Sequence, residues 1–136
     1  MNEKHHLLQE LAAGAIERLK LLPQPVVRVS GPISPNELYS YEENLARFIK
    51  AQQALRDRGF TVFDYFEDNG DEQVIQEHGL QDLVMEQYHQ PILQSGYLTA
   101  VYMMPHWELS GGARQEYQHF VDNDLPIKHI PEEWLL

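Results

Sequence analysis

The stretch Tyr97–Phe120, "YLTAVYMMPHWELSGGARQEYQHF", decides the fold. Its first eight residues are almost wholly apolar, and such a run is typical of a strand buried on both faces of a parallel sheet. A loop follows, and Ser110 is a good N-cap for a helix that runs to about Asn123. Strand, loop and helix in this order are half of the βαβ unit from which parallel sheets are built.

The same alternation continues toward both ends of the chain. Apolar residues at steps of three and four predict helices, and short β-branched runs predict strands. The expected helices are residues 3–22, 37–59, 73–95 and 110–123, and the expected strands are residues 26–30, 60–66, 97–104 and 127–130. We therefore expect the α/β class: a three-layer sandwich around a mainly parallel sheet of four or five strands, flavodoxin-like or Rossmann-like, with an extra N-terminal helix.

One domain is expected over residues 1–136, because this length supports one hydrophobic core and shows no repeat or linker. Residues 1–24 form its N-terminal helical extension, which Pro23 and Pro25 end. The leucine stripe of that helix has two interpretations. It either contacts a second copy of the chain or covers the sheet of its own.

Charge is distributed unevenly and excludes some partners. Residues 1–58 hold eight Lys/Arg and seven Asp/Glu, whereas residues 59–136 hold two and fourteen, so that net charges of +1 and −12 make up the total of −11. Such a surface repels a phosphodiester backbone, so no nucleic acid polymer is expected as a partner. No apolar run is long enough for a membrane span, no signal peptide is visible and cysteine is absent, which indicates a cytoplasmic protein. The histidines lack metal-binding spacing, and no cofactor is expected.

Two loops follow the first and third expected strands, where parallel sheets bind ligands. One is "SGPIS", Ser30–Ser34, and the other is "PHWELSGGA", Pro105–Ala113. Both contain glycine and lead toward helices. If the two strands are neighbours, these loops converge on one crevice.

The start of the last helix is open on one side. Gly111 and Gly112 follow Ser110 and leave unpaired first-turn amides accessible to an anion. Glu116 lies four residues after Gly112, on the same helix face, and side chains lean toward the helix N-terminus. This predicts a pocket with a carboxylate at its floor. The alternative is that the glycines permit close helix–sheet packing and Glu116 is an ordinary surface residue.

The elements "SGPIS" and W-x-x-S-x-G-A-x-x-E, which starts at Trp107 and ends at Glu116, carry a family resemblance. In this context residues 26–130 resemble the nucleoside 2-deoxyribosyltransferase family. The similarity is greatest to its small uncharacterised members and to the deoxynucleoside 5′-monophosphate N-glycosidases. The resemblance implies a small-molecule nucleoside or nucleotide as partner and assembly as a homo-oligomer, a dimer or larger.

The resemblance also implies roles for individual residues. Glu116 would be the nucleophile that attacks C1′ of the deoxyribose and expels the base in a retaining reaction. Substrate-binding roles would fall to three groups of residues: Ser110, Gly111 and Gly112 at the 5′-phosphate or 5′-hydroxyl; Gly31, Pro32, Ile33 and Ser34 over the sugar and base; Tyr39 or Tyr41, and Tyr65, at the base.

The chain departs from the family pattern at two positions. His89 and Tyr97 stand where the family usually has aspartates. His89 would either replace a carboxylate as the catalytic acid or be a surface histidine. Three functions therefore stay open: cleavage or transfer at the N-glycosidic bond of a deoxynucleoside or its monophosphate, nucleotide binding without turnover, and a related reaction on a ribonucleotide or NAD.

Overall fold

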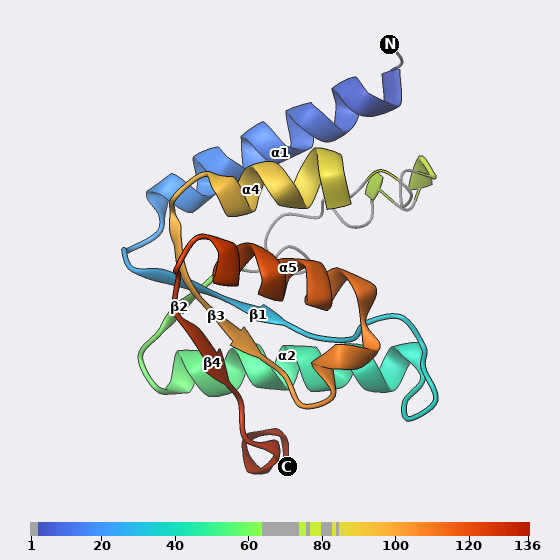
Figure 1. Ribbon diagram of the computed structural model, residues 1–136, viewed down its shortest axis with the longest axis vertical. Helices are drawn as coiled ribbons and strands as arrows, with labels where there is room; N and C mark the ends of the chain where they lie inside the picture. Colours follow the sequence, from blue (N-terminus) through green and yellow to red (C-terminus); the bar gives the residue numbers. More distant parts are fainter. Residues whose placement is uncertain (1–2, 64–73, 76, 80–82, 84) are drawn as a thin grey trace.

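A four-stranded parallel sheet forms the centre of the protein (Figure 1). The computed structural model describes residues 3–63, 74, 75, 77–79, 83 and 85–136. The strands are β1 (Val26–Ser30), β2 (Thr61–Val62), β3 (Leu98–Met103) and β4 (Ile127–His129), in the order β2-β1-β3-β4. The chain moves outward from β1 to β2 and then crosses to β3 on the other side of β1. The strand order therefore reverses between β1 and β3.

Helices cover both faces of this sheet, which confirms the three-layer α/β architecture (Figure 1). One face carries α2 and the other carries α5 and α4, with α1 packed outside α4. The helical elements are α1 (Glu3–Leu21), α2 (Tyr41–Asp57), the π-helix η2 (Met85–His89), α4 (Gln90–Gln94), the 3-10 helix η3 (Trp107–Leu109), α5 (Gly111–Asp122) and the 3-10 helix η4 (Glu132–Leu135). None of these described helices is long and apolar enough to cross a membrane.

Helix α2 begins at Tyr41, four residues later than the sequence pattern predicts. Ser40 and Glu43 form a capping box, in which the Glu43 amide donates to Ser40 Oγ at 3.1 Å and the Ser40 amide donates to Glu43 Oε1 at 2.9 Å. Just before it, the Asn36 side chain accepts from the amides of Leu38 and Tyr39. These local bonds compete with the helix and fix its start.

The leucine stripe of α1 is buried against its own chain. Leu8 and Leu19 are fully inaccessible to solvent, and they share a hydrophobic cluster with residues of α4, β3 and α5. Self-association would therefore have to use another surface than this face of α1.

Strand β1 is buried along its whole length although it contains two polar residues. Val27 and Val29 pack in the cluster that contains α2, and side chains alternate along a strand. Arg28 and Ser30 therefore face the opposite layer, which contains α5. Arginine is almost never fully buried without a partner, so this arrangement predicts an acidic side chain opposite Arg28.

Candidate active site

The loops after β1 and β3 converge, as expected for neighbouring strands. β1 and β3 pair in parallel from Val26 to Ser30, and the Met104 amide donates to the Ser30 carbonyl at 2.9 Å. A Cβ atom at Gly31 would lie 2.6 Å from Met104 Sδ and 2.7 Å from Met104 Cβ. Glycine is therefore needed at position 31 to bring the two loops into contact.

The glycines of the second loop have space around them. A Cβ atom at Gly112 would have Ser110 Oγ as its nearest neighbour, at 3.9 Å, and one at Gly111 would have Arg114 Nη2, at 3.6 Å. These two residues therefore do not serve close helix–sheet packing, and the start of α5 stays uncovered on their side.

Gly31→Ala is expected to lower the free energy of unfolding by about 1–3 kcal/mol, because the added methyl group overlaps buried Met104. The matched control is Gly112→Ala, which is expected to be neutral or to stabilise by up to about 1 kcal/mol, since alanine is the better helix residue. Urea denaturation of both variants measures the difference. Equal effects at the two positions would contradict this account of the loop contact.

Helix α5 starts as the sequence predicts. Ser110 has extended backbone angles, φ −111° and ψ 122°, and its Oγ accepts from the Ala113 amide at 3.1 Å. The amides of Gly111 and Gly112 lie in the first turn of α5, where no carbonyl group of the helix is available to accept a hydrogen bond from them. They lie at the positive end of the helix dipole, where an anion is stabilised.

Glu116 is buried in a polar cluster with two residues of β1. Its Oε1 forms an ion pair with Arg28 Nη2, and its Oε2 accepts a hydrogen bond from Ser30 Oγ. Glu116 is 4% exposed, Arg28 6% and Ser30 2%. Glu116 is therefore no surface residue. Its carboxylate is held under the carboxyl ends of β1 and β3, where the strand order reverses and where open α/β sheets bind ligands.

Arg28 is the site residue that the sequence reasoning missed. The signal was present, because an arginine in the middle of the run "VVRVS" has to be buried if that strand is central. A buried arginine predicts a carboxylate partner, but its position in the sequence does not identify which acidic residue this partner is.

His89 is the last residue of η2 and lies close enough to Arg28 for the positive charge of the guanidinium to affect its pKa. Burial of the imidazole, and secondarily the positive charge of Arg28, hold the pKa of His89 well below its usual value of 6.5. The imidazole is therefore neutral at neutral pH. A general acid has to carry a proton, so the low pKa restricts such a role for His89 to acidic solution.

This lowered pKa makes stability depend on pH. At pH values between the pKa of His89 in the folded protein and about 6.5, this histidine binds a proton in the unfolded chain but not in the folded protein. The free energy of unfolding therefore falls as the pH falls through this range, by at most about 1.4 kcal/mol per pH unit. We expect the free energy of unfolding of wild type to decrease below about pH 6.5 more steeply than that of His89→Gln. Urea denaturation between pH 7.5 and 5 measures the free energy of unfolding of both proteins, and an equal dependence on pH would refute this expectation. The control is His129→Gln, which replaces an exposed histidine.

The loop after β1 is anchored to α2. Asn44, 2% exposed, donates from Nδ2 to the Ser34 carbonyl at 2.9 Å, and Pro32 and Ile33 are buried and half-buried. This fixes the loop that the resemblance places over the sugar and base.

The tyrosines singled out in the sequence lie at different distances from the two loops. Tyr39 lies under the Arg47 guanidinium, 4.5 Å from it, and its ring is 6.3 Å from that of His106 in the loop after β3. Tyr41 is the exposed first residue of α2, with no ring contact among those described. Tyr97 precedes β3 and thus lies at the amino edge of the sheet, away from the loops. Tyr65 lies outside the described residues.

Comparison of the chain with models of protein families, with curated proteins and with solved structures finds no match. The family resemblance therefore depends on the residues of the two loops and of α5.

Proposed function

We propose that the protein cleaves or transfers at the N-glycosidic bond of a deoxynucleoside or a deoxynucleoside 5′-monophosphate, with Glu116 as the nucleophile. One observation carries this proposal: a buried carboxylate at the reversal of strand order, each oxygen of which is held by a side chain from β1. Arg28 and Ser30 fix the direction of the carboxylate, as a nucleophile requires.

The reaction would proceed in two steps. A Glu116 oxygen forms a bond to C1′ while the C1′–N bond breaks, and the base leaves with the electron pair and takes a proton from solvent. Water, or the nitrogen of a second base, then attacks C1′ and loses its proton to solvent, while the bond from C1′ to the Glu116 oxygen breaks and restores the carboxylate. A carboxylate oxygen has more than one acceptor site, so the contacts with Arg28 and Ser30 leave room for a bond to carbon.

The phosphate of a nucleotide would bind at the start of α5. Gly111 and Gly112 present backbone amides beside the Ser110 hydroxyl, and no side chain of these glycines blocks the approach. Gly31 to Ser34 would border the sugar, because their loop contacts the loop that leads into α5.

Binding without turnover is the second candidate. Two observations favour it: both Glu116 oxygens are engaged by β1 side chains, and the lowered pKa of His89 leaves this imidazole neutral at neutral pH, without the proton that a general acid would donate. In that case the ion pair would serve to fix α5 against the sheet, and the site would bind a nucleotide without cleaving it.

One experiment separates the two. The protein is incubated with deoxynucleosides, their 5′-monophosphates, ribonucleotides and NAD, and free bases are measured by chromatography while binding is measured by calorimetry. Base release from a deoxynucleoside or its monophosphate supports the enzyme. Binding without release supports the second candidate, and release from a ribonucleotide or NAD alone would change the substrate class. Neither binding nor release would refute both.

Gly112→Val tests the phosphate position. The branched side chain would fill the space beside the first-turn amides, so we expect affinity for a deoxynucleoside 5′-monophosphate to fall about tenfold or more, which is 1.4 kcal/mol or more. Affinity for the corresponding deoxynucleoside should change less, because it has no phosphate to place there. An unchanged monophosphate affinity, in a variant whose unfolding curve shows a folded protein, would move the phosphate elsewhere.

A further inference from the structure

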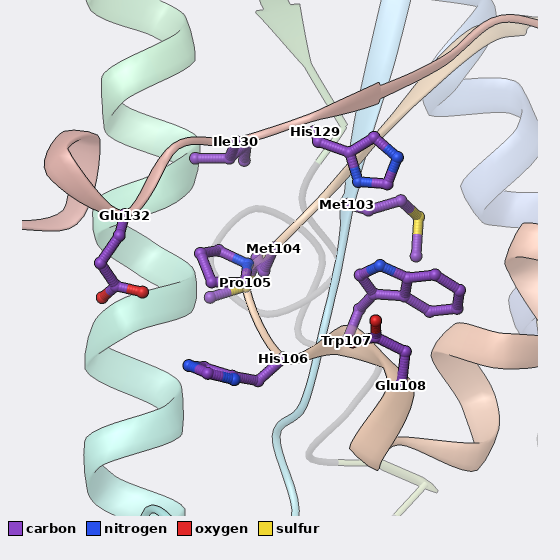
Figure 2. Close-up of a pocket in the computed structure, with 9 residues that line it drawn as sticks. All are labelled: Met103, Met104, Pro105, His106, Trp107, Glu108, His129, Ile130 and Glu132. Carbon is purple, nitrogen blue, oxygen red and sulfur yellow. The ribbon is translucent and has the colours of Figure 1, made fainter.

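A hollow opens at the carboxyl edge of the sheet, between the ends of β3 and β4 (Figure 2). Its volume is about 280 Å³, near the lower limit for small-molecule sites. Met103, Met104 and Ile130, all buried, provide an apolar floor, and the walls contain Trp107, His129, His106, Pro105, Glu108 and Glu132. The hollow is therefore apolar at the bottom and bordered by planar and acidic groups.

This hollow is separate from the cluster around Glu116. The partners of Glu116 both come from β1, whereas the hollow takes its residues from the end of β3, the loop after it, the end of β4 and the residues that follow β4. Glu116, Arg28 and Ser30 are not among its lining residues. A ligand in the hollow would not need the carboxylate of Glu116.

Planar side chains border the hollow on one side. Figure 2 shows the indole of Trp107 and the imidazole of His129 with the Met103 side chain between them. Tyr117 stacks on the indole, with ring centroids 4.5 Å apart and planes at 16°, and thereby fixes its orientation. A rigid indole and an imidazole over a thioether floor favour a flat aromatic ligand.

The polar groups select among flat ligands. Glu132 is held by Arg47 through two hydrogen bonds, of 2.7 and 3.2 Å, whereas no side-chain partner of Glu108 is found in the described part of the chain. A carboxylate only accepts hydrogen bonds, so Glu108 favours a ligand that donates. Glu108 and Glu132 both border the hollow, and their negative charges disfavour an anionic ligand at this place.

We propose that this hollow is a binding site for a neutral planar nitrogen heterocycle with an exocyclic amino group, of the adenine or cytosine type. The free base would bind better than its phosphorylated nucleotide. The ring lies against Trp107 and His129, and the amino group donates to Glu108. The site is independent of the reaction proposed for Glu116, so that either proposal can fail without the other.

Trp107 reports directly on occupancy of the hollow. The chain contains two tryptophans, and the other, Trp134, lies 3.8 Å from the Arg58 guanidinium on the α2 side. In a Trp134→Phe protein, the indole fluorescence therefore comes from Trp107 alone. Adenine is titrated with excitation at the red edge of the indole band, where the base does not absorb. Hypoxanthine, which has an oxo group in place of the amino group, and adenosine monophosphate are the matched ligands.

We expect saturable quenching by adenine, weaker binding of hypoxanthine and weaker binding of the monophosphate. His129→Ala should weaken adenine binding about fivefold or more, because a stacking surface is lost. Glu108→Gln should reduce the preference for adenine over hypoxanthine, and Glu116→Asp should leave adenine binding unchanged. Absence of quenching, equal affinity for adenine and hypoxanthine, or loss of binding in Glu116→Asp would each overturn the proposal.

Discussion

Arg28→Met is expected to lower the free energy of unfolding by about 3–5 kcal/mol, the typical cost of leaving one member of a buried ion pair without its partner. The substitution keeps an unbranched apolar side chain in the strand, but Glu116 then stays 4% exposed with Ser30 as its hydrogen-bond donor and no cation. Equilibrium denaturation in urea measures the change.

Arg47→Met is the matched control. Arg47 also pairs with a carboxylate, that of Glu132, but its side chain is 17% exposed and that of Glu132 is 48% exposed. Exposed pairs contribute about 0–1 kcal/mol, so this variant should lose far less stability. Similar losses in Arg28→Met and Arg47→Met would mean that burial does not decide the strength of the Arg28–Glu116 pair.

The double variant Arg28→Met/Glu116→Leu tests the same pair in another way. Removal of both charges leaves no uncompensated ion in the interior, and apolar replacements of buried ion pairs are often neutral or stabilising. We therefore expect the double variant to be more stable than Arg28→Met alone. A loss equal to the sum of the two single losses would show that the residues act independently.

The architecture was predictable because local patterns agree with it. The apolar run of β3, the N-cap Ser110 and the glycine that ends α2, Gly59 with φ 90°, each indicate the structure that forms. The start of α2 was readable too, since Ser40 and Glu43 have capping-box spacing, but apolar spacing extended the prediction to residue 37. As a result, Tyr41 was placed inside the expected helix, whereas it is the exposed first residue of α2.

The pairing of Arg28 with Glu116 could not be read from the sequence in the same way. It requires the strand order, which places β3 beside β1, and the facing of β1, which turns Arg28 toward α5. The chain offers 21 acidic residues as partners, and local spacing selects none of them. The hollow beside Trp107 could not be predicted for the same reason, because it joins the loop after β3 to the end of β4 and the residues that follow it.

The ion pair changes how the proposed nucleophile has to be tested. Glu116→Gln removes the carboxylate but also leaves Arg28 buried without a counter-charge, so a loss of activity would be mixed with a loss of stability. Any conclusion from this variant alone would confuse the two roles of Glu116. A variant that keeps the charge is needed beside it.

Glu116→Asp keeps the negative charge opposite Arg28 and shortens the side chain by one methylene group. We expect it to be more stable than Glu116→Gln, with a base-release rate at least about a hundredfold below wild type, because a displacement of about 1 Å is enough for such a loss. Glu116→Gln should lose on the order of a thousandfold or more, since the amide cannot form the covalent intermediate. Chromatography of released base, at temperatures where circular dichroism shows both variants folded, measures these rates. If Glu116→Asp is folded and as active as wild type, or if folded Glu116→Gln still releases base at the wild-type rate, Glu116 positions α5 and is not the nucleophile.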